Sequence, residues 1–313
     1  MIPWRYHLVS IMAIFLALGL GVVVGTTVIN PGLVKNLNNQ TDQLSQHVRD
    51  LQKDNQDLES ELDAMSTSGE QALPYLVGDT LFGRQVVIVT EEGVDARAIA
   101  ETRRALDLSG AEILTTLTVR PTMSGETPAA QRELSTVLGL SATTSADLLA
   151  PEAARSLARR LATDLTGDLS GRPDLLGELL SQGFLTSSAP DISDSTLKDI
   201  GGRGQIVVAV GGATADQLSP SSTLFMEPFV TELVAAGVVS GAGESLASDD
   251  GFVTGLRSNV DDSSVAPLVT VDNIDLAMGA SAMVLGLEAA LGDGIGGDYG
   301  VKDGATRLLP LPA

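Results

Sequence analysis

The chain has 313 residues, room for one large domain or two ordinary ones, and 43% of them are hydrophobic. That is enough apolar material for a packed core, which excludes a wholly disordered chain. The formal net charge of −21 repels phosphate backbones, so nucleic acid is not an expected partner. The absence of cysteine excludes disulfides, thiolate metal sites and cysteine nucleophiles.

An uncharged segment, Leu8 to Ile29, lies close to the N-terminus. As a helix it is roughly 33 Å long, enough to cross the core of a bilayer. It is too long for the apolar region of a signal peptide and lacks a small-residue cleavage site at its end. The pattern favours an uncleaved anchor over a cleaved signal peptide or a buried helix of a soluble protein. Trp4 and Tyr6 suit the aromatic belt of a membrane interface.

The charges beside this segment indicate its orientation. Arg5 and the terminal amine stand on the short side, and Lys35 stands on the long side, so the positive-inside rule leans towards a cytoplasmic N-terminus. We predict a single-pass protein of the inner (plasma) membrane, with residues 1–30 as cytoplasmic stub and anchor. The bulk of the chain then lies in the extracytoplasmic envelope.

A stripe of small residues runs along the anchor. The spacing of four places them on one helical face, where they would let two membrane helices approach closely. The alternative is the ordinary abundance of Gly and Ala in membrane helices. The stripe consists of Ala13, Ala17, Gly21 and Gly25.

A heptad repeat follows and predicts a coiled coil over residues 31–66. β-Branched residues at a, leucines at d and a single Asn at a favour a parallel homodimer. The alternative is one long amphipathic helix packed on its own domain. Asp54 at g opposes Glu59 at e of a partner, so the coil should be marginal on its own. The a positions are Val34, Thr41, Val48, Asn55 and Leu62, and the d positions are Leu37, Leu44, Leu51, Leu58 and Met65.

Residues 66–70 resemble a short hinge, and an α/β domain is expected over 67–291. Alternating strands and helices predict a Rossmann-like or flavodoxin-like three-layer domain, with a possible division into two βα subunits near 183–204. Residues 292–313 are expected to form an irregular, Gly-rich tail. The predicted strands are 85–90, 112–119, 205–210 and 265–271. The predicted helices are 95–109, 128–138, 144–149, 152–166, 173–182, 223–236 and 276–291.

The α/β part carries no recognisable catalytic pattern. Neither a G-x-G-x-x-G nor a P-loop follows its strands, and Ser195-Thr196-Leu197-Lys198 lacks the companion motifs of serine acyl-enzymes. The two histidines, His7 and His47, precede the domain, which excludes a Ser-His-Asp triad or a histidine zinc site within it. The sequence therefore predicts a non-enzymatic protein without a cofactor.

Acidic residues in loop-like sequence are the remaining candidate ligands. They could bind Ca²⁺ or Mg²⁺ loosely, although solvated loops explain them equally well. These residues are the pairs Glu91/Glu92, Asp249/Asp250 and Asp261/Asp262, with Asp293, Asp298 and Asp303 in the tail.

The chain resembles a known family along nearly its full length. The similarity lies in the aromatic-basic start Ile2–Ser10, the membrane helix with its coiled segment, the late segment Val269–Asp275, and Asp298-Tyr299-Gly300 with Gly304-Ala305. On these features it resembles the actinobacterial copper-transport proteins of the MctB type. The resemblance implies a role in copper homeostasis as an envelope or outer-membrane channel. Some corynebacterial relatives are linked to cell separation, where an envelope partner pair controls a peptidoglycan hydrolase.

The residues themselves do not favour a copper pore. Copper(I) prefers Cys and Met, and copper(II) prefers His. Met12 falls in the anchor, Met65 at a d position, and Met278 and Met283 in the last predicted helix, where a core role is the simpler interpretation. Serial alternating strands of a membrane β-barrel are not evident either. Copper as a ligand is thus implied by resemblance only.

Three functional hypotheses follow. The first is a dimeric, membrane-anchored adaptor or regulator that holds an envelope partner, such as a cell-wall hydrolase or another membrane protein. The second is a component of copper transport or homeostasis. The third is an unrecognised enzyme that works with carboxylates alone.

Overall fold

The computed structural model describes residues 4–27, 31–141, 144–164, 174–188, 194–212, 222–249, 251–260 and 266–310. The side chains of Val34 and Glu59 lie outside the description, as do Asp250, Asp261 and Asp262. The chain divides into two compact units, Met1–Met65 and Ser66–Ala313. Each unit is described separately below.

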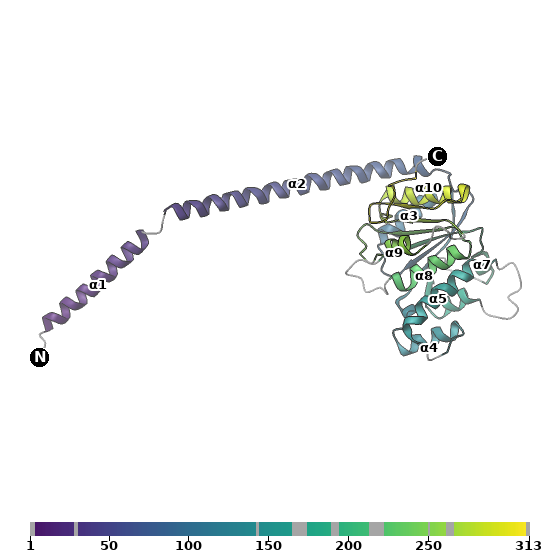
Figure 1. The fold of residues 1–313 in the computed structure, drawn as a ribbon, viewed down its shortest axis with the longest axis horizontal. Coiled ribbons are helices and arrows are strands. Elements are labelled where there is room, and N and C mark those ends of the chain that lie inside the picture. Colours follow the sequence, from purple (N-terminus) through teal and green to yellow (C-terminus); the bar gives the residue numbers. More distant parts are fainter. Residues whose placement is uncertain are drawn as a thin grey trace. The chain divides into compact units, whose positions relative to one another are not determined.

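The first unit contains helix α1 (Trp4–Thr27) and most of helix α2 (Pro31–Val77) (Figure 1). Within α1, Trp4–Gly25 is long and apolar enough to cross a membrane, and its described side chains are exposed. The predicted anchor is therefore a candidate membrane span. Pro31 is the first residue of α2, a position that tolerates proline because its missing N–H needs no partner there.

Helix α2 does not end at the segment predicted as a hinge. It continues through residues 66–70 to Val77, and Leu73 and Val77 are fully buried in the core of the second unit. Gly69 lies against Met278 of helix α10 (Ala277–Asp293), where a Cβ at position 69 would come within 3.3 Å of the methionine Cγ. Local composition suggested a break, but tertiary packing stabilises the helix here.

The second unit is built on a seven-stranded sheet with the order β3-β2-β1-β4-β5-β6-β7. All neighbouring strands are parallel except β2 and β3. Without the antiparallel β3, the strand order is β2-β1-β4-β5-β6-β7, which is the flavodoxin-like order with one more strand at its end. The strand order changes direction between β1 and β4. The strands are β1 (Gln85–Glu91), β2 (Glu112–Val119), β3 (Leu185–Ser187), β4 (Ile206–Gly211), β5 (Ser240–Glu244), β6 (Leu268–Val271) and β7 (Gly297–Tyr299).

The sequence predicted β1, β2, β4 and β6 but missed the other three strands. Strand β5, Ser-Gly-Ala-Gly-Glu, has none of the β-branched residues that mark a buried strand. Its glycines are needed because Met283 and Ile274 pack directly against Gly241 and Gly243. Strand β7 adds the predicted irregular tail to the edge of the sheet, so that prediction was wrong for residues 297–299.

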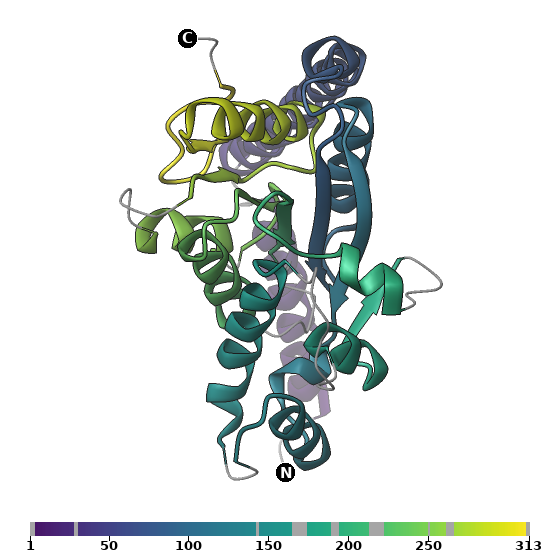
Figure 2. The same cartoon turned by 90° about the vertical axis from the view of Figure 1, so that its right-hand side faces the viewer.

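Helices cover both faces of the sheet, which gives the predicted three layers (Figure 2). The end of α2, α3 (Ala96–Leu108) and α10 pack with one hydrophobic cluster. The second cluster is formed with α4 (Pro128–Val137), α5 (Ala146–Leu161), α6 (Leu175–Ser181), α8 (Ser222–Ala235) and α9 (Phe252–Asn259). Two short elements, η1 (Pro121–Ser124) and α7 (Asp194–Asp199), complete the unit.

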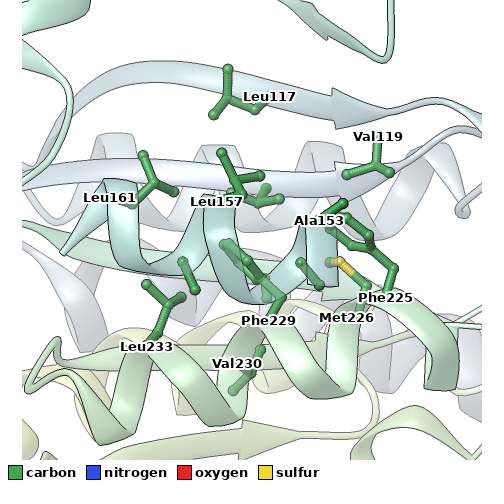
Figure 3. Close-up of a cluster of buried hydrophobic side chains, with 14 of the residues drawn as sticks. Leu117, Val119, Ala153, Leu157, Leu161, Phe225, Met226, Phe229, Val230 and Leu233 are labelled. Carbon is green, nitrogen blue, oxygen red and sulfur yellow. The ribbon is translucent and has the colours of Figure 1, made fainter. Parts of the chain in front are cut away.

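Helix α5 lies at the centre of the second cluster. Leu157 and Leu161 face the strand that carries Leu117, and Phe229 of α8 packs from the other side (Figure 3). The sequence predicted two helices here, over 144–149 and 152–166. The structure instead has one helix with Pro151 inside it.

Candidate functional site: a charged clasp at the strand ends

Three buried carboxylates lie at or directly after the carboxyl ends of strands in the α/β unit. Open parallel sheets bind their ligands at this edge, which makes it the first place to look for a site. Glu91 ends β1, Glu244 ends β5, and Asp272 directly follows β6; all three are buried. Gly211, the last residue of β4, pairs with Glu244, the last residue of β5, so the ends of these two strands lie side by side.

Asp272 is the centre of the first ion pair. Its carboxylate accepts a hydrogen bond from Nη1 of Arg257 at 2.8 Å and two more from the backbone N–H groups of Val301 and Lys302 at 2.7 and 3.0 Å. Gly300 has a φ of +129°, and a Cβ there would collide with this carboxylate. Glycine therefore lets the chain after β7 approach Asp272 closely enough for both backbone groups to bind it.

Arg257 extends from α9 and uses its whole guanidinium group. Besides the bond to Asp272, it donates to the Thr270 hydroxyl at 2.8 Å and to the carbonyl oxygens of Tyr299 and Asp303 at 2.7 and 3.1 Å. Its side chain is almost completely buried. Five donors in a fixed plane suit such a site, and Lys could not reproduce them.

Glu244 and Lys302 form the second ion pair. The Lys302 Nζ donates to Oε1 of Glu244 at 2.9 Å and to the carbonyl oxygens of Ser245 and Ser248 at 3.1 and 2.7 Å. The other oxygen of Glu244 accepts the backbone N–H of Val253 at 3.2 Å, in the first turn of α9. A carboxylate at a helix N-terminus is favoured by the helix dipole.

We call Glu244, Arg257, Asp272 and Lys302 the charged clasp. It contains two positive and two negative side chains, each engaged in several hydrogen bonds, so it is neutral as a group. It joins α9 and the segment after β7 to the ends of β5 and β6. The clasp therefore suits a structural role, because each of its charges binds other groups of the protein rather than a substrate.

A cavity of about 530 Å³ lies beside the clasp, in the size range of small-molecule sites. Leu256, Leu268 and Ile295 form part of its apolar wall, and Thr270 and Asp298 contribute polar groups. Asp298 accepts the hydroxyl hydrogen of Thr270 at 2.7 Å and keeps 37% of its side chain exposed.

Tyr299 of β7 has a pKa above its ordinary value. Burial raises its pKa, the positive charge of Arg307 lowers it, and Asp298 raises it further. Burial is the largest cause, and the neutral phenol is therefore favoured in the folded protein.

The candidate acidic ligands do not gather into one place. Among the residues that the structure describes, no three His, Cys, Asp or Glu side chains are grouped as metal ligands. Glu92 pairs with Arg120 at 3.2 Å, and Asp298 and Asp303 lie near Arg257 rather than near a further carboxylate cluster. Asp250, Asp261 and Asp262, as well as the side chains of Ser195 and Thr196, fall outside the described residues.

The methionines are divided between exposed helices and the core. Met283 is buried against β5, and Met278 is partly exposed beside Gly69, while Met12 and Met65 are exposed on α1 and α2. His7 and His47 also lie on these two helices, which belong to the first unit up to Met65.

The sequence contained a partial signal for the clasp. Asp272, Asp298 and Gly300 lie within the two late segments that carry the family resemblance, and the structure brings these segments together. Glu244, Arg257 and Lys302 were missed, because pairing between residues so far apart leaves no local pattern.

Comparison with known proteins places the chain in a family. A family model described as "Copper transport outer membrane protein, MctB" matches residues 1–310. The chain belongs to this family. The "Copper transporter MctB" of Mycobacterium tuberculosis (strain H37Rv) is 27% identical over 327 residues, which cover 98% of this chain and 99% of the relative. The protein of the same name from Mycobacterium leprae (strain TN) is 27% identical over 325 residues with the same coverage.

The match extends across both units, from α1 to the segment after β7. The resemblance recognised in the sequence is thereby confirmed. The description of the family names copper transport and indicates no enzymatic activity.

Proposed function

We propose that the protein is a membrane-anchored component of copper transport or homeostasis in the cell envelope. The observation that carries this proposal is the family match over residues 1–310, together with relatives named copper transporters that align over almost their entire length. The candidate span Trp4–Gly25 supports attachment to a membrane. The N-terminus is proposed to face the cytoplasm, and the α/β unit to lie in the envelope.

The experiment is a measurement of metal content in cells that lack the protein. We expect copper per cell to change several-fold, zinc to stay unchanged, and the full chain to restore the original copper level. Unchanged copper content in the deletion strain would overturn the proposal. A chain with residues 4–27 replaced by an unrelated membrane helix of equal length tests whether α1 contributes more than anchoring.

Direct binding is tested separately with full-length protein in detergent, titrated with copper against a competing chelator. The full chain is needed because His7 and Met12 lie on α1. Binding near one ion per chain or per dimer would indicate that the protein carries copper itself. Binding no stronger than the chelator background would indicate that it acts on copper through another component.

A second candidate function is a non-enzymatic adaptor or regulator for an envelope partner, such as a cell-wall hydrolase. The observation that favours it is the heptad face of α2, exposed from Leu37 to Met65, which would join two copies into the dimeric stalk of such an adaptor. The two functions are separated by growing the deletion strain with and without a copper chelator. Chelation should correct defects caused by copper, whereas a failure of cell separation that persists under chelation would favour the adaptor.

A further inference from the structure

Helix α2 presents a continuous apolar face that is exposed in the single chain. Its members keep between 46% and 71% of their surface exposed and follow the alternating spacing of three and four. A contiguous stripe of this kind marks an interaction surface, because monomeric soluble proteins rarely expose one. The exposed members are Leu37, Leu44, Val48, Leu51, Leu58, Leu62 and Met65.

The same side of the helix joins the α/β unit further along the chain. Gly69 is the next a position after Leu62, and Gly69, Leu73 and Val77 are buried. The exposed part of the heptad face therefore ends at Met65, where the part that packs within the chain begins. The alternative that the helix packs on its own domain holds for its last turns but does not account for the apolar face before them.

We infer that the face from Leu37 to Met65 is the interface between two copies of this chain, arranged as a parallel two-stranded coiled coil. The polar a positions, Thr41 and Asn55, point to a second copy as the occupant. In a parallel, in-register pair each Asn55 meets the Asn55 of the other chain, and the two amides can hydrogen-bond to each other. A different partner would have to supply a polar residue at the same layer.

The candidate membrane span favours the same occupant. Two copies anchored through Trp4–Gly25 share one membrane and one orientation, which raises their effective concentration and enforces the parallel arrangement. The inference does not rest on the copper function, so either proposal can fail without the other.

The charges beside the interface predict how the dimer can be strengthened. Asp54 at g opposes Glu59 at e of the second copy, and this like-charge contact occurs twice in the symmetric pair. Asp54→Lys should turn repulsion into attraction and lower the apparent dissociation constant roughly tenfold. Asp57→Lys is the matched control, because it makes the same charge change at an exposed c position, outside the interface.

Because the chain has no cysteine, single cysteines can report the register directly. Leu58→Cys places a thiol at d, where two parallel helices come within disulfide distance, and Ser60→Cys places it at the outward f position. Full-length protein in detergent should form covalent dimers under diamide with Leu58→Cys and only background amounts with Ser60→Cys. Equal or negligible cross-linking of both variants would overturn the parallel register.

Ultracentrifugation of the full chain in detergent gives the second measurement. We expect a dimer for the wild type and a shift towards monomer for Leu51→Asp, which places a charge at a d position that the dimer would bury. The helical circular dichroism of the α/β unit and its protease resistance should remain, which separates loss of the interface from misfolding. A monomeric wild type, or Asp54→Lys and Asp57→Lys with equal effects, would overturn the inference.

Discussion

The Nζ of Lys302 lies 2.9 Å from Oε1 of Glu244, although the two residues are 58 positions apart. Glu244 ends a central strand, and Lys302 belongs to the segment after the edge strand β7. This ion pair, with the pair of Arg257 and Asp272, holds the C-terminal segment on the sheet. Four predictions test the two cations of the charged clasp and two neighbouring residues, Gly300 and Tyr299.

Replacing Lys302 should destabilise the fold more than its partly exposed position suggests. Lys302→Met leaves the Glu244 carboxylate buried without its cation, which we expect to cost about 2–4 kcal/mol of the free energy of unfolding. Denaturant unfolding measures the loss, and limited proteolysis after β7 should show release of the segment. Lys198→Met, at an exposed position on α7, serves as the control and should change little. Equal stability of the two variants would contradict the role of the pair.

Arg257→Lys should be disruptive although it conserves the charge. Lysine can replace at most part of the four hydrogen bonds, and it loses the guanidinium donor to the Tyr299 carbonyl oxygen, which also accepts the backbone N–H of Asp272. We expect a loss of roughly 2–4 kcal/mol, since each hydrogen bond to a charged group is worth about 1.5–3 kcal/mol. The same change at the exposed Arg132 of α4 is the control. Thermal unfolding of both variants provides the comparison, and matched melting temperatures would refute the prediction.

Gly300→Ala should prevent the approach of the C-terminal segment to Asp272. The substitution combines an unfavourable φ with a collision between Cβ and the carboxylate, so we expect a cost of about 2–5 kcal/mol. Gly139→Ala separates the two effects, because Gly139 also has a positive φ but no atom near its missing Cβ. Its cost should stay near 1–2 kcal/mol. If both alanine variants lose the same stability, steric exclusion at Asp272 is not important.

Tyr299 should make the fold sensitive to alkaline pH. Its pKa is raised above the ordinary value near 10, so the folded state holds the phenolic proton more tightly than the unfolded chain does. This contribution is fully present below about pH 10 and is lost as the pH rises through the folded pKa. Unfolding measured from pH 8 to 11 should show a decline that is smaller in Tyr299→Phe. Identical slopes for wild type and variant would contradict it.

The strands that could be predicted are those whose own residues carry the signal. Strand β1 is a run of β-branched residues buried on both faces, and such a run is recognisable without its neighbours. Strand β5 could not be recognised, because its glycines reflect the space that Met283 and Ile274 occupy. The charged clasp could not be predicted for the same reason. In the sequence, Glu244 and Lys302 each resemble a solvated surface charge, and only the fold brings them together.

The sequence by itself determined the candidate membrane span, the heptad face of α2, the α/β class and the family resemblance. All four depend on composition or on spacing along the chain, which local physical chemistry translates directly into structure. The tertiary structure alone decided that α2 continues to Val77, that the C-terminal segment joins the sheet, and that four distant charges form one clasp. These features depend on contacts between residues far apart in the chain, whose energies arise only after the sheet has assembled.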